Sequence, residues 1–429
     1  MSERKTIGGD PPVKSSTGIY HGWIIAIVSF LAVGGSIGFA QFGFGLFIVP
    51  LEREFDWSRT QINFALMLGI VVHICSPLVG RTVDMFGSRY VMAISLVVIA
   101  LGFFLRSAMT DLWQFYVFST LIFLGGPGAA MLPAGRLVGL WFPSTRGRMM
   151  GFVTGGNNFG GLVAIPILTL IITTGGWRTA FFATGVMLVV LSVIAYVFVK
   201  DKPYEVQREI GKRWTPPGIT SQAIGKAITG LSVGEALRTR AFWLIGSGMT
   251  LQQFVRTTLV TQLAAYLVDV GLSATQIGAS LSVLAFFGIT SKIIFGRLSE
   301  VTTARWAYTL VIGIQISGVG SFLFLSGTNF IPLFLSLAVF GLGMGGVGTL
   351  GPLAVTEMFG LKNFGSISGF IRQGVIIPGV VGPLLAGAVY DRTGAYDLAF
   401  QIILIFLTLS CLCFALARPP RMSEGSIRL

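Results

Sequence analysis

Charged residues are scarce in this sequence. Asp, Glu, Lys and Arg make up 11% of its 429 residues, and 53% of the residues are hydrophobic, whereas soluble domains carry about 25% charged residues. The mean hydropathy of +0.80 indicates that most of the chain lies in hydrocarbon. The composition therefore excludes a water-soluble domain as the body of the protein.

Cysteines and catalytic clusters are also lacking. The three cysteines, Cys75, Cys411 and Cys413, all fall in apolar stretches, so we expect neither a structural disulfide nor a metal site. The sequence has no Gly-x-x-x-x-Gly-Lys-Ser/Thr phosphate loop and no His/Asp/Glu cluster at membrane depth. We expect no cofactor and no enzymatic activity. The first 20 residues lack the apolar core of a cleavable signal, so the first helix is expected to stay in the mature protein.

Apolar stretches long enough to cross a bilayer, which takes roughly 20 residues, occur twelve times. We predict an all-α integral membrane protein with twelve transmembrane helices in two pseudo-symmetric six-helix bundles. The predicted divisions are an N-terminal tail (1–20), an N-terminal bundle (21–200), a basic linker (201–240), a C-terminal bundle (241–418) and a C-terminal tail (419–429). The predicted helices cover 23–49, 60–79, 90–108, 113–142, 149–173, 179–199, 241–268, 274–296, 306–327, 330–359, 366–389 and 396–417.

The net charge of +13 is distributed unevenly over this topology. With the N-terminus inside, 21 of the 30 Lys and Arg lie in the tails and inner loops, 5 in outer loops (including Arg106) and 4 within helices. This excess places both termini in the cytoplasm and argues against nucleic-acid binding. The linker lies either against anionic lipid headgroups or in water.

The two halves resemble each other in sequence. Ser58-x-x-Gln61 opens the second predicted helix and Ser273-x-x-Gln276 opens the eighth, and both are capping-box patterns. Gly151-Phe152 in helix 5 is matched by Gly369-Phe370 in helix 11. Such duplication is how many secondary transporters are built, with a site between the halves.

A glycine-rich charged loop follows the second predicted helix. Gly80-x-x-x-Asp84-x-x-Gly87-x-Arg89 resembles the signature loop of the major facilitator superfamily, and a degenerate copy is present at Gly296-Arg297-x-x-Glu300. The resemblance implies that this loop stabilises the outward-open state. Asp84 is expected to accept hydrogen bonds from a helix N-terminus across the interface between halves. The alternative is a charged turn that only fixes topology.

Short stretches around the first helix narrow the resemblance. Tyr20-His-Gly-Trp23 and Phe55-Asp-Trp57-Ser58-Arg59 are similar to the bacterial branch related to monocarboxylate transporters and the oxalate–formate exchanger. The resemblance implies a carrier in the bacterial inner membrane, functional as a monomer. Its substrate would be a small organic anion, moved by proton symport or anion exchange.

Four cations lie inside the predicted helices. They are Arg136, Arg256, Lys292 and Arg372, and no Asp or Glu sits well inside any span. A buried cation costs roughly 2.5–3.5 kcal/mol on insertion scales. A carboxylate about 4 Å away gains approximately 4 kcal/mol at an effective dielectric near 20. An anionic ligand would offset the cost, so the pattern favours anion transport.

Helices 7, 8 and 1 supply the predicted substrate contacts. Gln252 lies four positions before Arg256, on the same helix face, and offers a second polar contact. In the alternative interpretation, Arg256 pairs with a carbonyl of a neighbouring helix or with a water-filled cavity. Lys292 resembles the helix-8 arginine that holds the carboxylate in the relatives, although lysine lacks the guanidinium fork, and its alternative is snorkelling. Gln41 stands where animal monocarboxylate transporters carry a lysine.

Two residues are candidates for proton coupling. The relatives have an aspartate one turn before the helix-8 arginine, where this chain has Gly288. Asp269 is a possible substitute for that proton site, as in bacterial lactate carriers. The alternative is that Asp269 is only a loop residue at a helix C-terminus. His73 is the second candidate, or a hydrogen-bonded structural residue.

The remaining polar residues at depth have less specific roles. Arg136 and Arg372 are predicted to form a gate or interface ion pair with Asp84 or Glu357. Asn157 and Asn158, among glycines in helix 5, need polar partners. They loosely resemble the signature of nitrate carriers, so an inorganic anion remains an alternative. Export of hydrophobic compounds and a membrane sensor are further alternatives.

Overall fold

The structure is a computed structural model that describes residues 21–39, 43–201, 230–323 and 330–420. Gln41, both tails and most of the linker lie outside the described residues. The described residues are largely helical, and their one β-type contact is an isolated bridge between Gly230 and Gly360. Eight helical segments among them are long and apolar enough to cross a membrane.

The N-terminal half begins with a broken helix. A π-helical turn interrupts the first predicted span, and Gly176, with φ of 81°, divides the long α9 at the boundary predicted between helices 5 and 6. The elements are α1 (His21–Val33), η1 (Gly34–Gly38), α3 (Phe44–Phe55), α4 (Arg59–Met67), α5 (Ile70–Phe86), α6 (Ser88–Ser107), α7 (Leu112–Ala129), α8 (Met131–Trp141) and α9 (Arg146–Phe198).

The C-terminal half follows the same plan after the linker. Its eleventh predicted span is broken between α17 and α18, as the second is between α4 and α5. The elements are α12 (Val233–Leu237), α13 (Arg240–Asp269), α14 (Ala274–Val301), α15 (Ala304–Phe322), α16 (Phe330–Phe359), α17 (Phe364–Gln373), α18 (Ile376–Thr393) and α19 (Asp397–Leu416). Each predicted stretch thus coincides with one or more helical segments in the described part of the chain.

The capping boxes expected in both halves are present. The hydroxyl of Ser58 accepts from the backbone N–H of Gln61 at 3.2 Å, and the Gln61 side chain accepts from the Ser58 N–H at 2.8 Å. Ser273 and Gln276 repeat this arrangement with distances of 3.4 and 2.9 Å. Two equivalent helix N-termini are therefore satisfied by the same local sequence.

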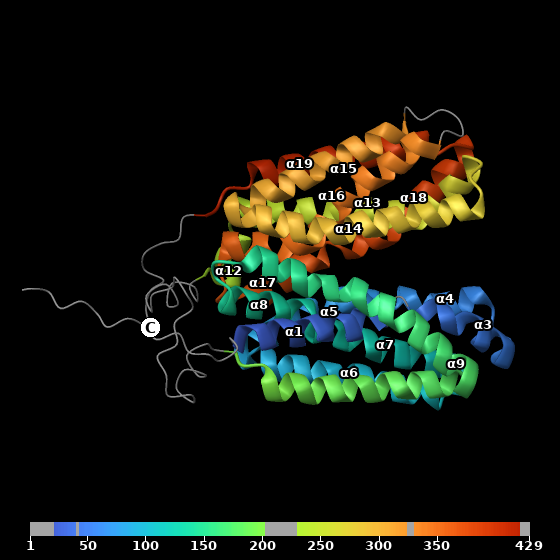
Figure 1. The fold of residues 1–429 in the computed structure, drawn as a ribbon. Helices are drawn as coiled ribbons and strands as arrows, with labels where there is room; N and C mark the ends of the chain where they lie inside the picture. Colours follow the sequence, from blue (N-terminus) through green and yellow to red (C-terminus); the bar gives the residue numbers. More distant parts are fainter. Residues whose placement is uncertain (1–20, 40–42, 202–229, 324–329, 421–429) are drawn as a thin grey trace, which may run out of the picture.

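Figure 1 shows the two halves as separate groups of helices lying side by side. The described segments that border the linker and the tails lie at one end of the bundle, which we call the linker end; the opposite end is the far end. Contact between the halves runs chiefly through α5 with α17 and α9 with α14. In Figure 1, α17 lies between the halves toward the linker end.

Arg106 corrects one expectation about topology. The charge count placed it in an outer loop, although it lies within the predicted helix 90–108. In the structure it is near the end of α6, and its side chain turns back into the N-terminal half, where it is 5% exposed. It donates to the Ser119 hydroxyl. Its guanidinium also lies over the rings of Phe103, Phe115 and Phe181, at 4.7–5.9 Å from their centroids. Cation–π contacts thus replace the water that a loop residue would have.

Candidate functional site

Glycines bring the two halves into backbone contact at the linker end. A Cβ on Gly80 of α5 would collide with the Gly365 backbone of α17, and a Cβ on Gly365 would collide with Gly80. Gly296 of α14 and Gly147 of α9 exclude each other's Cβ in the same way. Only glycine permits helices to approach this closely.

Carboxylates from each half complete these contacts. Asp84 accepts from the Gly365 N–H at 2.9 Å and from the N–H and hydroxyl of Ser366, both at 2.7 Å. The bonds from a helix N-terminus that the sequence predicted for Asp84 are therefore confirmed. Glu300 accepts from the backbone N–H and the Nε of Arg148, both at 2.8 Å, at the start of α9. Helix N-termini favour such negative charge.

The two interfaces are copies of one arrangement. Asp84 and Glu300 each lie four residues after the contacting glycine of their own half. One turn before that glycine, the backbone of Ser76 touches Gly369, and the backbone of Lys292 touches Gly151. The sequence match between helices 5 and 11 is thus a match between contact surfaces.

The rest of the signature loop acts within the N-terminal half. Gly87 has φ of 88°, which favours glycine, and it lies against the carboxylate of Asp201. Asp201 accepts from the N–H groups of Ser88 and Arg89 at the start of α6. Arg89 donates from Nε to the Tyr196 carbonyl at 2.5 Å. Asp201 follows a helix end more than a hundred residues away, so sequence reasoning had no signal for it.

The gate ion pairs predicted for Arg136 and Arg372 are not among the salt bridges of the described residues. Arg136 donates to the Val83 carbonyl and lies within electrostatic range of Asp84. Glu357 instead accepts from the Ala304 N–H at 2.6 Å, at the start of α15. Arg372 thus has neither Asp84 nor Glu357 as a salt-bridge partner in the described part of the chain.

Arg372 lies instead near two other groups that can carry positive charge. It is within electrostatic range of Arg256 on α13, and both are within range of His73 on α5, across the interface. Helix packing explains the meeting: His73 and Arg372 each lie about one turn beyond the Ser76–Gly369 contact, toward the far end.

Arg256 is exposed although neighbouring helices lie close to it. Its Nε donates to Gln253 Oε1 at 3.0 Å. Gln252, predicted from spacing as a second polar substrate contact beside Arg256, is instead 3% exposed, and its Oε1 has no hydrogen-bond partner in the described part of the chain. Arg256 therefore contacts the glutamine three positions before it rather than the one four positions before it.

Lys292 joins two predicted site residues across the second interface. Its Nζ donates to Asn158 Oδ1 at 2.5 Å and to the Thr154 carbonyl at 3.0 Å, both on α9. Asn157, the neighbouring amide, has a buried Oδ1 without a hydrogen-bond partner among the described residues. The structure therefore brings Lys292 and Asn158 together but leaves Asn157 out of that contact.

Asp269 lies away from these cations, at the far end of α13. It is exposed and accepts a hydrogen bond from Tyr390 of α18. Tyr390 also packs against Tyr396, with ring centroids 4.7 Å apart. Asp269 therefore has a structural partner within the C-terminal half.

Ion pairing is sparse in this fold. Within the described ranges the salt bridges are Arg59–Glu52, Arg148–Glu300 and Arg178–Glu54. None of them includes Arg256, Lys292 or Arg372.

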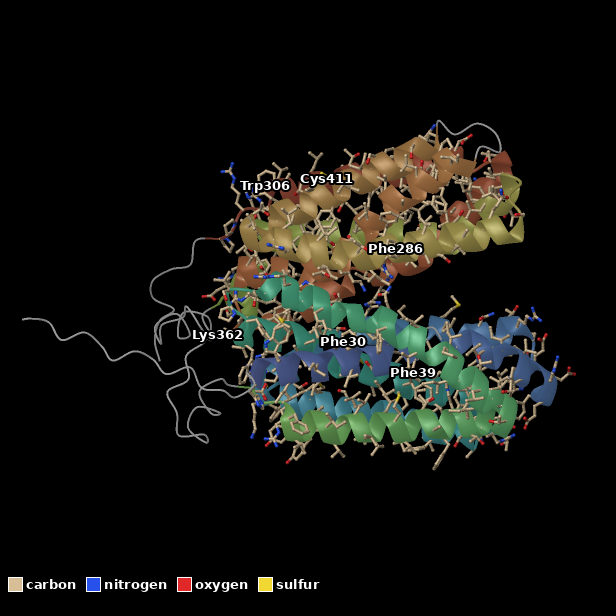
Figure 2. All side chains as sticks on the ribbon, in the orientation of Figure 1. Phe30, Phe39, Phe286, Trp306, Lys362 and Cys411 are labelled. Atoms are coloured by element: carbon tan, nitrogen blue, oxygen red, sulfur yellow. The ribbon has the colours of Figure 1, made fainter. Side chains whose placement is uncertain are left out.

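Figure 2 shows aromatic residues in both halves, with Phe30 on α1 and Phe286 on α14. Phe30 stacks on Phe152, with centroids 4.9 Å apart.

Comparison with known proteins agrees with this geometry. The model of the Major Facilitator Superfamily matches residues 26–372 and 245–428. The chain belongs to the Major Facilitator Superfamily. The match covers both halves, and the chain is accordingly an integral membrane protein and a Major Facilitator Superfamily transporter with twelve helices in two halves.

Relatives within the Major Facilitator Superfamily are distant. Monocarboxylate transporter 2 of Rattus norvegicus is 23% identical over 410 residues, covering 92% of this chain and 82% of that protein. The oxalate:formate antiporter of Oxalobacter formigenes is 23% identical over 428 residues, covering 98% of each. The crystal structure of the human organic anion transporter MFSD10 superimposes with a TM-score of 0.71 at 15% identity, over 94% of this chain and 100% of that one. The structural likeness shows the fold alone.

Proposed function

We propose that the protein is a secondary active transporter of a small organic anion, most simply a monocarboxylate, working by proton symport or anion exchange. The observation that carries the proposal is the set of cations at the interface. Arg256, Arg372 and Lys292 lie at or beside the contact between halves, and none forms a salt bridge with the described residues. Such charge is costly at membrane depth unless an anion offsets it.

The arrangement suits a site that opens at the far end. In this conformation the glycine contacts and the Asp84 and Glu300 bonds close the linker end. An anion entering between the halves meets the exposed Arg256 and, next to it, Arg372. Lys292 uses two of its three N–H donors on α9, which leaves one for the anion.

The names of the relatives support an anionic substrate. One is a monocarboxylate transporter and one an oxalate:formate antiporter. With the linker end in the cytoplasm, as the charge distribution predicts, the described conformation faces outward. We place the protein in a bacterial inner membrane, functional as a monomer.

Thermal-shift binding to the purified protein tests the proposal. The panel contains lactate, pyruvate, longer monocarboxylates, oxalate, succinate, aromatic acids, nitrate and uncharged controls, with Arg256→Gln and Lys292→Met in parallel. Arg89→Gln, a cation that bonds within one half, is the matched control. We expect a carboxylate to stabilise the wild type and the control but neither site variant.

Other outcomes assign other functions. Stabilisation by nitrate alone would make the protein an inorganic-anion carrier. Stabilisation only by hydrophobic cations or neutral drugs would overturn the anion proposal and favour export of hydrophobic compounds. Binding of a carboxylate without any transport of it in proteoliposomes would favour a sensor.

A further inference from the structure

His73 lies beside the contact between the two halves. It lies on α5 of the N-terminal half, about one turn beyond Ser76, whose backbone touches Gly369 of α17. The guanidiniums within its electrostatic range, Arg372 and Arg256, both belong to the C-terminal half. An anion held by those two arginines therefore has His73 as its neighbour on the opposite half.

The two ring nitrogens of His73 have different surroundings. Nδ1 is buried and has no hydrogen-bond partner among the described residues. Nε2 also lacks a partner there but is not among the buried atoms, and the residue as a whole is only partly buried. The nitrogen that reaches accessible space is thus Nε2.

These surroundings disfavour an imidazolium. A protonated ring has an N–H on both nitrogens, so Nδ1–H would be buried without an acceptor, which is costly. Its positive charge would also face two guanidiniums with no carboxylate from α5, α13 or α17 to offset it. A neutral ring with its proton on Nε2 avoids both penalties and leaves one donor on the nitrogen that is not buried.

We propose that His73 binds the transported anion as a neutral hydrogen-bond donor through Nε2, and that it does not carry the coupling proton. This inference rests on the proposed anion site. Through His73 the N-terminal half contacts directly a ligand whose charge is bound by Arg256 and Arg372 of the C-terminal half. The anion then contacts both halves, so its binding free energy can differ between the conformations in which the halves are arranged differently.

Two substitutions separate donation from protonation. In His73→Gln the amide N–H₂ takes the place of Nε2–H but cannot gain a proton near neutral pH. In His73→Phe the ring volume is kept and the donor is lost. Ile74→Ala, at an exposed position next to it on α5, is the matched control. Equal unfolding temperatures without ligand verify that each variant is folded.

Binding of lactate, oxalate and nitrate is measured for each variant from pH 5 to 8. We expect His73→Gln to bind within about threefold of wild type with an unchanged pH profile, and His73→Phe to bind at least about tenfold more weakly. Equal losses in both variants, no loss in His73→Phe, or a pH dependence that disappears in His73→Gln would each overturn the inference.

Arg256→Gln distinguishes this inference from the function on which it rests. If wild type binds none of the three anions, or if Arg256→Gln binds as well as wild type, the anion site itself is wrong and the role of His73 falls with it. If Arg256→Gln loses binding and the His73 variants behave as wild type, the anion site stands and only the inference fails.

Discussion

Lys292 of α14 and Asn158 of α9 connect the two halves, with Nζ donating to Oδ1 at 2.5 Å. The bond lies on the same interface as the contact between Lys292 and Gly151. An ammonium at this depth needs polar partners, and the amide and the Thr154 carbonyl supply them from the opposite half. The cation therefore contributes to the contact between halves as well as to the proposed anion site.

A double-mutant cycle on this pair is the first prediction. We expect Lys292→Met and Asn158→Ala each to lower the free energy of unfolding, with a coupling of about 1–2 kcal/mol, because a hydrogen bond to a charged group is lost. Chemical unfolding without ligand measures it. The matched control is a second cycle that combines Lys292→Met with Asn157→Ala. If its coupling energy were as large as that of the cycle with Asn158→Ala, the hydrogen bond between Lys292 and Asn158 would be contradicted.

A side chain at Gly80 is expected to prevent closure of the linker end. In Gly80→Val the added atoms meet the Gly365 backbone, which cannot move aside as a flexible side chain can. We predict that uptake in proteoliposomes falls at least about tenfold, a loss of about 1.4 kcal/mol or more in closure. Gly313→Val on α15, where a Cβ meets nothing within 4 Å, should keep normal uptake. Normal uptake by Gly80→Val would mean that this contact is not part of the cycle.

Removing the charge of Asp84 is expected to favour opening at the linker end. Asp84→Asn weakens the bonds to Gly365 and Ser366, at a cost of about 1–2 kcal/mol. A cysteine replacing the fully buried Ser76, in a background without native cysteines, should react with a thiol reagent about 5–30 times faster. Asp111→Asn, at the start of α7, is the control and should leave the rate unchanged. An unchanged rate in Asp84→Asn as well would remove Asp84 from the gate.

The sequence predicted the fold well because membrane helices are long apolar runs whose ends carry local signals. Ser58-x-x-Gln61 and Ser273-x-x-Gln276 are such signals, and both helices start where they indicate. The Asp84 contact was also predictable, since a family motif specifies both the residue and its kind of partner. These features depend on neighbours in sequence or on a recognised pattern.

The partners of the membrane cations depend on helix rotation and on contacts between distant segments, which one sequence does not specify. Arg372 lies within electrostatic range of Arg256 and His73, and Glu357 is bonded to the start of α15. Arg106 was counted with the outer loops although it lies within the predicted helix 90–108, and its side chain turns into the N-terminal half near the end of α6. In both cases the direction in which a charged side chain leaves its helix sets its environment.

The reciprocal carboxylate contacts have an energetic consequence for the empty carrier. Asp84 and Glu300 each cross from one half to the other at the linker end. At the far end, the described Arg59–Glu52 and Arg178–Glu54 pairs stay within one half. Reversal of the carrier therefore breaks charged contacts at the linker end without breaking these far-end pairs. The Asp84 and Glu300 contacts favour the conformation closed at the linker end when no ligand is bound.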